Sequence, residues 1–254
     1  MNWQTDWIQG SPLFALLTAL PSTLTRSADW VSIDLLNQYA ATHGITNTSG
    51  MTIQFSASTS ELAYETQIAE TGHVPTRVAN WHDYFNALTW LIWPHSKAAF
   101  NQLHIAAGMT ARRNRQRDAL TLLDESGVIV ACTDVALWEL LQQHQWHALF
   151  TEQRERVKKE MAFHLIGHAL FEKALQPYPA MTGKCQLIKV SPDFFALPLA
   201  QRQQQLDLLL AQQLLQQPPL TPSEFAALPV LGIPGMTPEN SDPAYYQNTQ
   251  VFRP

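Results

Sequence analysis

The chain has 254 residues, of which 46% are hydrophobic and 15% are charged. This composition excludes a disordered protein, and the length is sufficient to bury a large core. The net charge of -5 offers no broad basic surface for nucleic acid, and two cysteines are too few for a disulfide framework.

The location is predicted from the cysteine content and the N-terminal residues. Few cysteines favour a reducing compartment, and the start lacks the basic segment and long apolar run of a secretory signal. The longest apolar run, residues 85–93, is interrupted by Asn86 and Thr89 and is too short to cross a bilayer. We therefore expect a cytoplasmic protein without a membrane segment.

The first half of the chain is predicted to be mainly helical. Residues 12–42 have the pattern of two short helices, and residues 51–55 alternate with the two-residue period of a strand. Asn80 is a suitable N-cap for a helix over residues 81–93, and a second helix is expected over residues 96–107.

The second half is predicted to add strands. Residues 119–131 have two apolar runs around a turn-forming centre, which indicates a β-hairpin. Residues 133–175 have a helical pattern with one interruption, and residues 184–190 are a candidate strand. Residues 199–217 form a Gln-rich amphipathic helix, and the proline-rich residues 218–254 are expected to extend over the surface as an arm.

These elements predict the fold class and the domain organisation. We expect one α+β domain over residues 1–254, predominantly helical, around a small antiparallel sheet that contains the hairpin. No internal repeat and no Gly- or Ser-rich linker marks a domain boundary.

A dense polar cluster at residues 80–90 is the first candidate site. His82 and Asn86 are four residues apart and so lie on one helix face, with Asp83 beside them. A His next to an Asp suits general acid–base catalysis, so His82, Asp83 and Asn86 are candidate catalytic residues. The alternative is a helix N-terminus that Asn80 caps and Asp83 stabilises through the helix dipole, and for Asp83 we prefer it.

A second candidate site is a possible stripe of His and Glu residues on the helical pattern. Glu160, His164, His168 and Glu172 follow one another at intervals of four, which would place them on one helix face. Two imidazoles at this spacing can bind a divalent metal ion, with Glu172 as a third ligand. The HExxH motif is absent because Leu165 stands where it requires Glu, and a buried helix with one polar edge is the alternative.

Basic and amide side chains are candidates for binding a substrate. Residues 112–117 form an Arg-rich segment that could bind a phosphate or carboxylate, or could be solvated or paired internally. The candidate substrate-binding residues are Arg77, Asn80 and Arg113. The common Gly-rich nucleotide-binding loops and the Gly-x-Ser-x-Gly motif are absent from the sequence.

Several separated motifs resemble a bacterial family catalogued as domain of unknown function 3025, and the resemblance spans roughly residues 60–254. The motifs are residues 73–77, 80–83, 85–87, 117–121, 167–170, 172–173 and 246–254. The resemblance implies one continuous unit and implies no activity, substrate or cofactor.

Two functional hypotheses follow from the sequence. The first is a metal-assisted hydrolase for a small polar or anionic substrate, which requires His82 and His168 to meet in one cleft. The second is a non-catalytic ligand-binding or protein-interaction module, in which the polar clusters are buried networks that fix helix packing. Neither hypothesis includes nucleic acid or a membrane as a partner.

Overall fold

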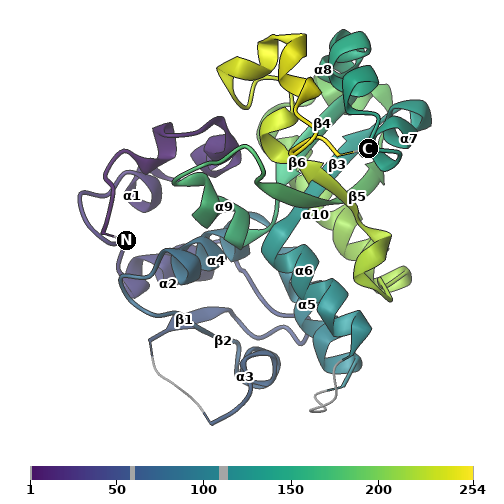
Figure 1. Cartoon of the computed structure of the whole chain (residues 1–254). Coiled ribbons are helices and arrows are strands. Elements are labelled where there is room, and N and C mark those ends of the chain that lie inside the picture. The colour runs from purple at the N-terminus through teal and green to yellow at the C-terminus, as the bar shows by residue number, and fades with distance from the viewer. Residues whose placement is uncertain (1, 58–60, 109–113, 254) are drawn as a thin grey trace.

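The computed structural model describes residues 2–57, 61–108 and 114–253. The N-terminal half is mainly helical and the C-terminal half carries the larger sheet (Figure 1), so the predicted α+β class is confirmed. The α-helices of the described residues are α1 (Ser22–Thr25), α2 (Ile33–Thr42), α3 (Tyr64–Thr71), α4 (Trp81–Ile92), α5 (Pro94–Ala106), α6 (Arg115–Ser126), α7 (Val135–Gln142), α8 (Arg154–Glu160), α9 (His168–Ala174) and α10 (Leu199–Gln216). The strands are β1 (Gln54–Ser56), β2 (His73–Pro75), β3 (Gly127–Cys132), β4 (Met161–Leu165), β5 (Thr182–Lys189) and β6 (Ala226–Pro229).

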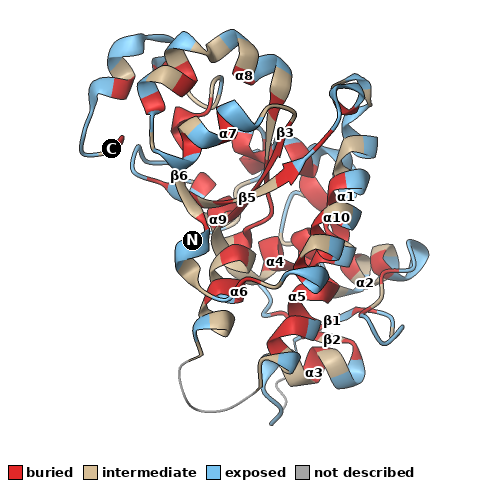
Figure 2. Cartoon of the chain, turned by 90° about the vertical axis from the view of Figure 1, so that its right-hand side faces the viewer, coloured by how far each residue is buried: buried red, intermediate tan, exposed pale blue. Residues whose placement is uncertain are grey.

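Helix α4 lies in the core of the helical half. Its N-cap is Asn80, as predicted, and the Asn80 side-chain oxygen accepts a hydrogen bond from the backbone N–H of Asp83 at 3.0 Å. The residues from Tyr84 to Ile92 are all buried (Figure 2), which is typical of a helix covered on every side. Only the first turn, with His82 and Asp83, keeps partly exposed side chains, and this turn faces the candidate site.

Helix α5 follows α4 directly and is held by α10. Pro94 stands at the first helical position, where its missing N–H is not needed. The Asp207 carboxylate of α10 accepts hydrogen bonds from the backbone N–H groups of His95 and Ser96 at 3.0 and 2.8 Å. A carboxylate at this end also stabilises the helix dipole, so α10 fixes the turn of α5 that carries Lys97.

The larger sheet has four strands in the order β4-β3-β5-β6. The central strand β3 is fully buried, and it pairs antiparallel with β4 and parallel with β5. The pairing of β5 with β6 is antiparallel, and a separate two-stranded sheet joins β1 and β2 in parallel. The sheet was predicted to be antiparallel, but it is mixed, with both parallel and antiparallel pairs.

A close backbone approach at Gly167 sets the position of α9. A Cβ atom there would lie 2.5 Å from the Glu125 carbonyl oxygen and 2.5 Å from the Gly127 nitrogen. The Gly167 N–H donates to the Gly127 carbonyl at 3.0 Å. Only a glycine permits this approach, which places His168, the next residue, beside the end of α6.

The predicted hairpin at residues 119–131 is wrong. Residues 115–126 form helix α6, capped by the Asn114 side chain, which accepts from the N–H of Gln116 at 2.9 Å, and β3 begins only at Gly127. Ala119, Leu120 and Leu123 are buried together, since the spacing that suggested a strand also suits one face of a helix.

The helical region predicted over residues 133–175 is wrong at residues 161–165, which form a strand. This region contains α7, α8, the strand β4 and then α9. Met161–Leu165 pairs along β3, so a long-range contact overrides the local helical pattern. Residues 218–254 differ from a surface arm in that β6 belongs to the sheet, whereas Tyr246 and Phe252, expected to anchor the arm, are buried.

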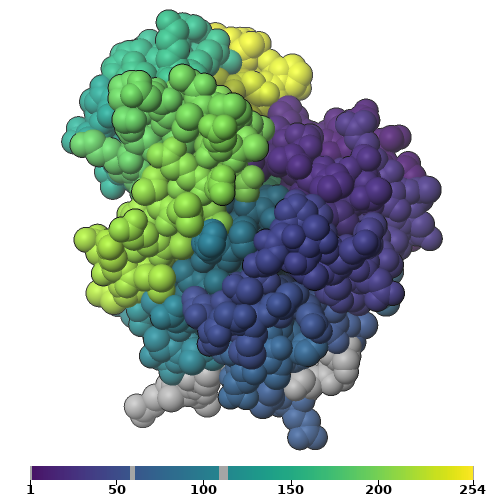
Figure 3. All heavy atoms as spheres, turned by 180° about the vertical axis from the view of Figure 1, so that it is seen from behind, coloured from purple at the N-terminus to yellow at the C-terminus, as the bar shows by residue number. Residues whose placement is uncertain are grey.

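The buried hydrophobic side chains form one cluster that extends through both halves. Trp3 stacks on Trp81 with ring centroids 4.7 Å apart, which ties the N-terminal segment to α4. From behind, the N-terminal residues lie alongside the residues of the middle of the chain (Figure 3). Among the helices that the structure describes, none combines the length and the apolar character needed to cross a membrane.

Candidate functional site

Two histidines from distant parts of the chain meet at the N-termini of α4 and α9. The Nε2 atoms of His82 and His168 are 3.1 Å apart, and the ring centroids are 4.6 Å apart with an interplanar angle of 77°. The two imidazoles therefore share one cleft, as the hydrolase hypothesis requires. The side chain of His168 is 7% exposed and that of His82 is 35% exposed, so His82 is the member that faces solvent.

Each of these histidines has a carboxylate near its other ring nitrogen. His82 Nδ1 lies 3.0 Å from Glu172 Oε2, a hydrogen-bond distance. His168 Nδ1 lies 3.8 Å from Asp124 Oδ2, which attracts a proton on that nitrogen without a direct hydrogen bond. Burial is the main reason that the pKa of His168 falls to about 3, so its ring is neutral at pH 7.

A buried lysine anchors the inner side of the site. Lys97 Nζ donates to Asp124 Oδ1 at 2.6 Å and to Asn86 Oδ1 at 2.8 Å. Burial on its own would raise the pKa of Asp124, but the Lys97 ammonium, through its charge and its hydrogen bond, lowers it below its usual value. Asn86 Nδ2 in turn donates to the Tyr64 hydroxyl at 2.8 Å, so this network joins α3, α4, α5 and α6.

Among the carboxyl groups at the site, Glu65 has the most raised pKa. Burial, opposed by the Asn101 hydrogen bond and reinforced by the charge of Asp124, raises the pKa of Glu65 to about 7. The Asn101 side chain donates to Glu65 Oε2 at 2.7 Å, and His104 Nε2 lies 4.0 Å from Oε1. Burial lowers the pKa of His104 to about 4. Glu65 thus changes protonation near neutral pH, where a proton-transfer group is most effective.

Asp83 and Arg77 form a pair at the rim of the site. The Asp83 carboxylate accepts from Arg77 Nε at 2.8 Å, from Arg77 Nη2 at 2.9 Å and from the Arg77 backbone N–H at 2.7 Å. Burial alone would raise the pKa of Asp83, but these contacts lower it. Asp83 therefore lies in the first turn of α4 and also accepts hydrogen bonds from Arg77. The planar donor groups of Arg77 are used in this pair.

These side chains surround a hollow of about 320 Å³. Its lining includes four acidic residues, Glu65, Asp83, Asp124 and Glu125, and one basic residue, Arg77. The lining also holds the rings of His82 and His168. The hollow thus combines titratable groups of different pKa with an excess of carboxylates over cations, which makes it a candidate functional site.

The predicted metal triad of His164, His168 and Glu172 is not formed on one helix face. His164 lies on strand β4 and is buried beside Trp93, with ring centroids 6.4 Å apart. Burial lowers the pKa of His164 to about 4. Glu172 lies on α9 and bonds His82 instead. No group of three His, Cys, Asp or Glu side chains within the described ranges is placed to hold a metal ion.

The remaining residues of the predicted site have other roles or lie elsewhere. Asn80 acts as the helix cap, and Asn86 is an acceptor for buried Lys97 rather than an exposed catalytic amide. Arg113 lies outside the described residues. The sequence analysis missed Glu65, Lys97 and Asp124, of which Lys97 had a visible signal, because a lysine inside an apolar helical run needs a buried partner.

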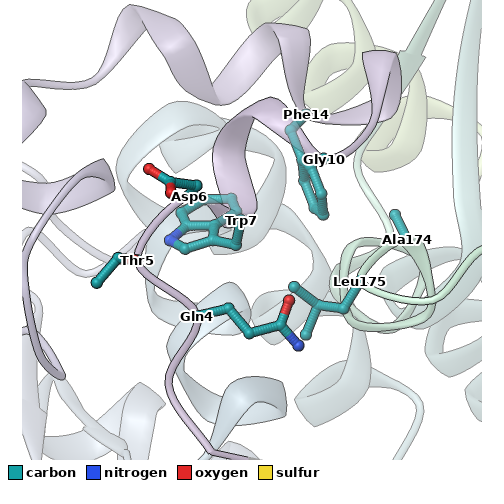
Figure 4. Close-up of a pocket in the computed structure, with 8 residues that line it drawn as sticks. All are labelled: Gln4, Thr5, Asp6, Trp7, Gly10, Phe14, Ala174 and Leu175. Atoms are coloured by element: carbon teal, nitrogen blue, oxygen red, sulfur yellow. The ribbon is translucent and has the colours of Figure 1, made fainter.

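A second hollow of about 300 Å³ lies between the N-terminal segment and the end of α9 (Figure 4). Its lining contains Asp6 as the sole ionisable side chain, together with Gln4, Trp7, Phe14, Leu175 and small residues. It lacks paired proton donors and acceptors, so the hollow around His82 and His168 is the better candidate for chemistry.

The fold and this hollow define an α+β protein with a polar pocket built between helices. Residues 52–254 match the family described as "Protein of unknown function (DUF3025)", which is more than half of the chain. The chain belongs to this family. No curated protein and no solved structure matches the chain.

Proposed function

We propose that the hollow around His82 and His168 is the active site of a hydrolase for a small polar molecule. The observation that carries this proposal is the 3.1 Å approach of the two Nε2 atoms, with a carboxylate behind each ring. Paired groups of this kind accept a proton from an attacking water and return it to a leaving group.

His82 is the proton-transfer group in this proposal, because it is the more exposed member of the pair. When His82 Nε2 takes a proton, the new N–H has His168 Nε2 as its acceptor, and the Nδ1–H keeps Glu172. Both N–H groups of the imidazolium are then hydrogen-bonded, so the charged form is stabilised. His168 and Glu172 are positioning residues, and Glu65 supplies a second group that titrates near pH 7.

The charge of the lining favours a neutral or cationic substrate over the anionic one considered from the sequence. The acidic residues outnumber the basic ones, and the guanidinium of Arg77 already binds Asp83 at two nitrogens. An anion would meet carboxylates with no unengaged guanidinium from Arg77 to offset them.

The alternative, a non-catalytic polar network, is favoured by one part of the site. Lys97, Asp124 and Asn86 satisfy one another at short distances and connect three helices. A network so complete fixes helix packing. We assign this part a structural role and the His82–His168 part the chemical one.

The test is hydrolysis of a panel of neutral and cationic esters and amides by the purified full chain. We expect turnover by the wild type and a loss of about 10²- to 10⁴-fold in His82→Gln, the range for a missing acid–base group. The matched control is His43→Gln, at an exposed histidine away from the hollow. Folded wild-type protein that hydrolyses no member of the panel, or a His82→Gln variant with wild-type rates, contradicts the proposal.

A further inference from the structure

We infer that the point between the Nε2 atoms of His82 and His168 binds a divalent transition-metal ion of the Zn²⁺ class. This inference concerns the same hollow as the proposed function, but it does not require turnover. While the ion is bound, His82 Nε2 is a ligand and takes no proton, so hydrolysis in that state would rely on metal-bound water rather than on His82 as the base. The site differs from the triad considered from the sequence, because His82 takes the place of His164 and Glu172 lies behind a ligand.

The carboxylates behind the two rings favour tautomers that would leave room for a cation between the Nε2 atoms. Glu172 accepts from a protonated Nδ1 of His82, and the charge of Asp124 favours a proton on Nδ1 of His168. Neutral rings that are protonated at Nδ1 direct both Nε2 lone pairs at each other across 3.1 Å. A positive species between the lone pairs turns this repulsion into attraction.

The separation of the nitrogens fits a metal ion. With Zn–N bonds of about 2.0–2.1 Å, nitrogens 3.1 Å apart subtend about 100° at the ion, close to the tetrahedral angle. Both rings offer Nε2, the neutral imidazole nitrogen that Zn²⁺ takes as a ligand. The ion would lie to one side of the line between the nitrogens, so each ring must turn its lone pair towards it while the separation of the nitrogens stays as it is.

The carboxylates that favour these tautomers are also the usual partners of histidines that bind a metal. Histidines that bind metals commonly donate the other ring N–H to a carboxylate, which fixes the tautomer and makes the ligand nitrogen more basic. Glu172 has this position for His82 at 3.0 Å, and Asp124 lies on the same side of His168 at 3.8 Å.

The charge and burial of the site favour a metal ion over an extra proton. Lys97 offsets the charge of Asp124, whereas Glu172 interacts with the charge of Arg77, which itself pairs with Asp83. The buried ring of His168 can coordinate an ion as the neutral imidazole, which is the form that binds a metal. A divalent cation thus gains from the excess of carboxylates around the hollow.

The protein supplies two ligands, because no third side chain joins them among the residues described. The remaining coordination positions are left to water or substrate, as in catalytic rather than structural metal sites. An ion with such an open position lowers the pKa of bound water, which is the chemistry that a hydrolase needs. Binding should be weaker than in a structural zinc site with four protein ligands.

The experiment is calorimetric titration of the metal-stripped full chain with Zn²⁺, supported by the visible absorption of Co²⁺. We expect one ion per chain in the wild type and loss of binding in His82→Gln and in His168→Gln. Glu172→Gln, at a half-exposed position that folding tolerates, should weaken binding about 10- to 100-fold, the range for a group behind a ligand. His43→Gln is the matched control and should bind as the wild type does.

Circular dichroism and thermal unfolding show whether each variant is folded. If Zn²⁺ fails to bind the wild type, or binds equally well after His82→Gln and Glu172→Gln, the metal site is wrong. Hydrolysis that survives in EDTA and still requires His82 would leave the proposed function standing without the metal. Stoichiometric binding without hydrolysis would support the metal site and overturn the proposed function.

Discussion

The two sides of the hollow differ in how completely their polar groups are satisfied. On the inner side, Lys97 is 3% exposed and bonds Asp124 and Asn86 at 2.6 and 2.8 Å. On the outer side, His82 and Glu172 are about one third exposed, and Nδ1 of His168 has no direct hydrogen-bond partner among the described residues. The comparison teaches that the inner side holds the helices together, whereas the outer side is where we propose proton transfer and ligand binding.

The largest expected effect comes from breaking the inner side. Lys97→Met leaves the Asp124 carboxylate without its cation in a mostly buried position, so unfolding should become easier by about 3–5 kcal/mol. Urea denaturation measures this change. Lys158→Met, which removes an exposed ion pair with Glu155, is the matched control and should change stability by at most about 1 kcal/mol. Equal effects of the two variants would contradict the contrast drawn here.

The pH dependence of stability sharpens the role of Glu65. The folded pKa of about 7 lies above the usual value of 4.5 for a glutamic acid, so Glu65 stabilises the fold at low pH and loses this contribution as the pH rises towards 7. Glu65→Gln, which resembles the protonated acid, should match the wild type near pH 4.5 and exceed its stability at pH 8 by at most about 3 kcal/mol.

Urea denaturation of both proteins from pH 4.5 to pH 8 measures this difference. Buried histidines act in the opposite sense, since the lowered pKa values of His104 and His168 destabilise the fold as the pH falls below 6.5. The two histidines contribute equally in the wild type and in Glu65→Gln, so their contribution cancels in the difference between the two proteins. Glu70→Gln, an exposed position on the same helix, controls for the loss of one charge. If the difference in stability between Glu65→Gln and the wild type is the same at every pH, Glu65 is ionised in the folded protein over the whole range and its pKa is not raised.

The backbone contact at Gly167 lies between the two sides of the hollow, because it joins the end of α6 on the inner side to His168 on the outer side. Gly167→Ala places a Cβ atom 2.5 Å from backbone atoms of residues 125 and 127, which should cost about 1–3 kcal/mol and displace His168 from His82. Gly10→Ala, where the nearest atom is 3.2 Å away, is the milder control. Thermal unfolding and Zn²⁺ titration measure the two consequences. Unchanged Zn²⁺ binding in a destabilised Gly167→Ala would separate the histidine pair from this contact.

The smallest effect is expected at the rim. Arg77 is 70% exposed, so Arg77→Ala should change stability by less than about 1 kcal/mol. If Arg77 only pairs with Asp83, the variant should keep the KM of a neutral substrate. A large rise in KM for an anionic substrate would restore the substrate-binding role considered from the sequence.

The site was partly predictable from the sequence because α4 obeys local rules. Asn80 caps it, Pro94 follows it, and His82 with Asp83 marks its polar first turn. The pairing of His82 with His168 was a requirement of the hydrolase hypothesis, and the structure brings the two rings together. Their catalytic and binding roles stay predictions.

The features of the site that the sequence did not predict depend on contacts between residues that are distant along the chain. His164 and His168 are four apart in sequence, but His164 pairs within the sheet opposite Ile129, and the chain turns at Gly167 before His168 begins a helix. A local period of four cannot reveal such a change of element. Glu65 and Asp124 were missed for the same reason, because burial and charged neighbours from other helices set their pKa values.

The most direct test of the central claim is a ¹H–¹⁵N correlation spectrum of the histidine ring nitrogens, assigned with His82→Gln and His168→Gln. The account predicts that both rings are protonated at Nδ1, and that removing either ring, or adding Zn²⁺, shifts the Nε2 resonance of the other. Rings that are protonated at Nε2 and indifferent to each other's removal would contradict the convergence on which the site depends.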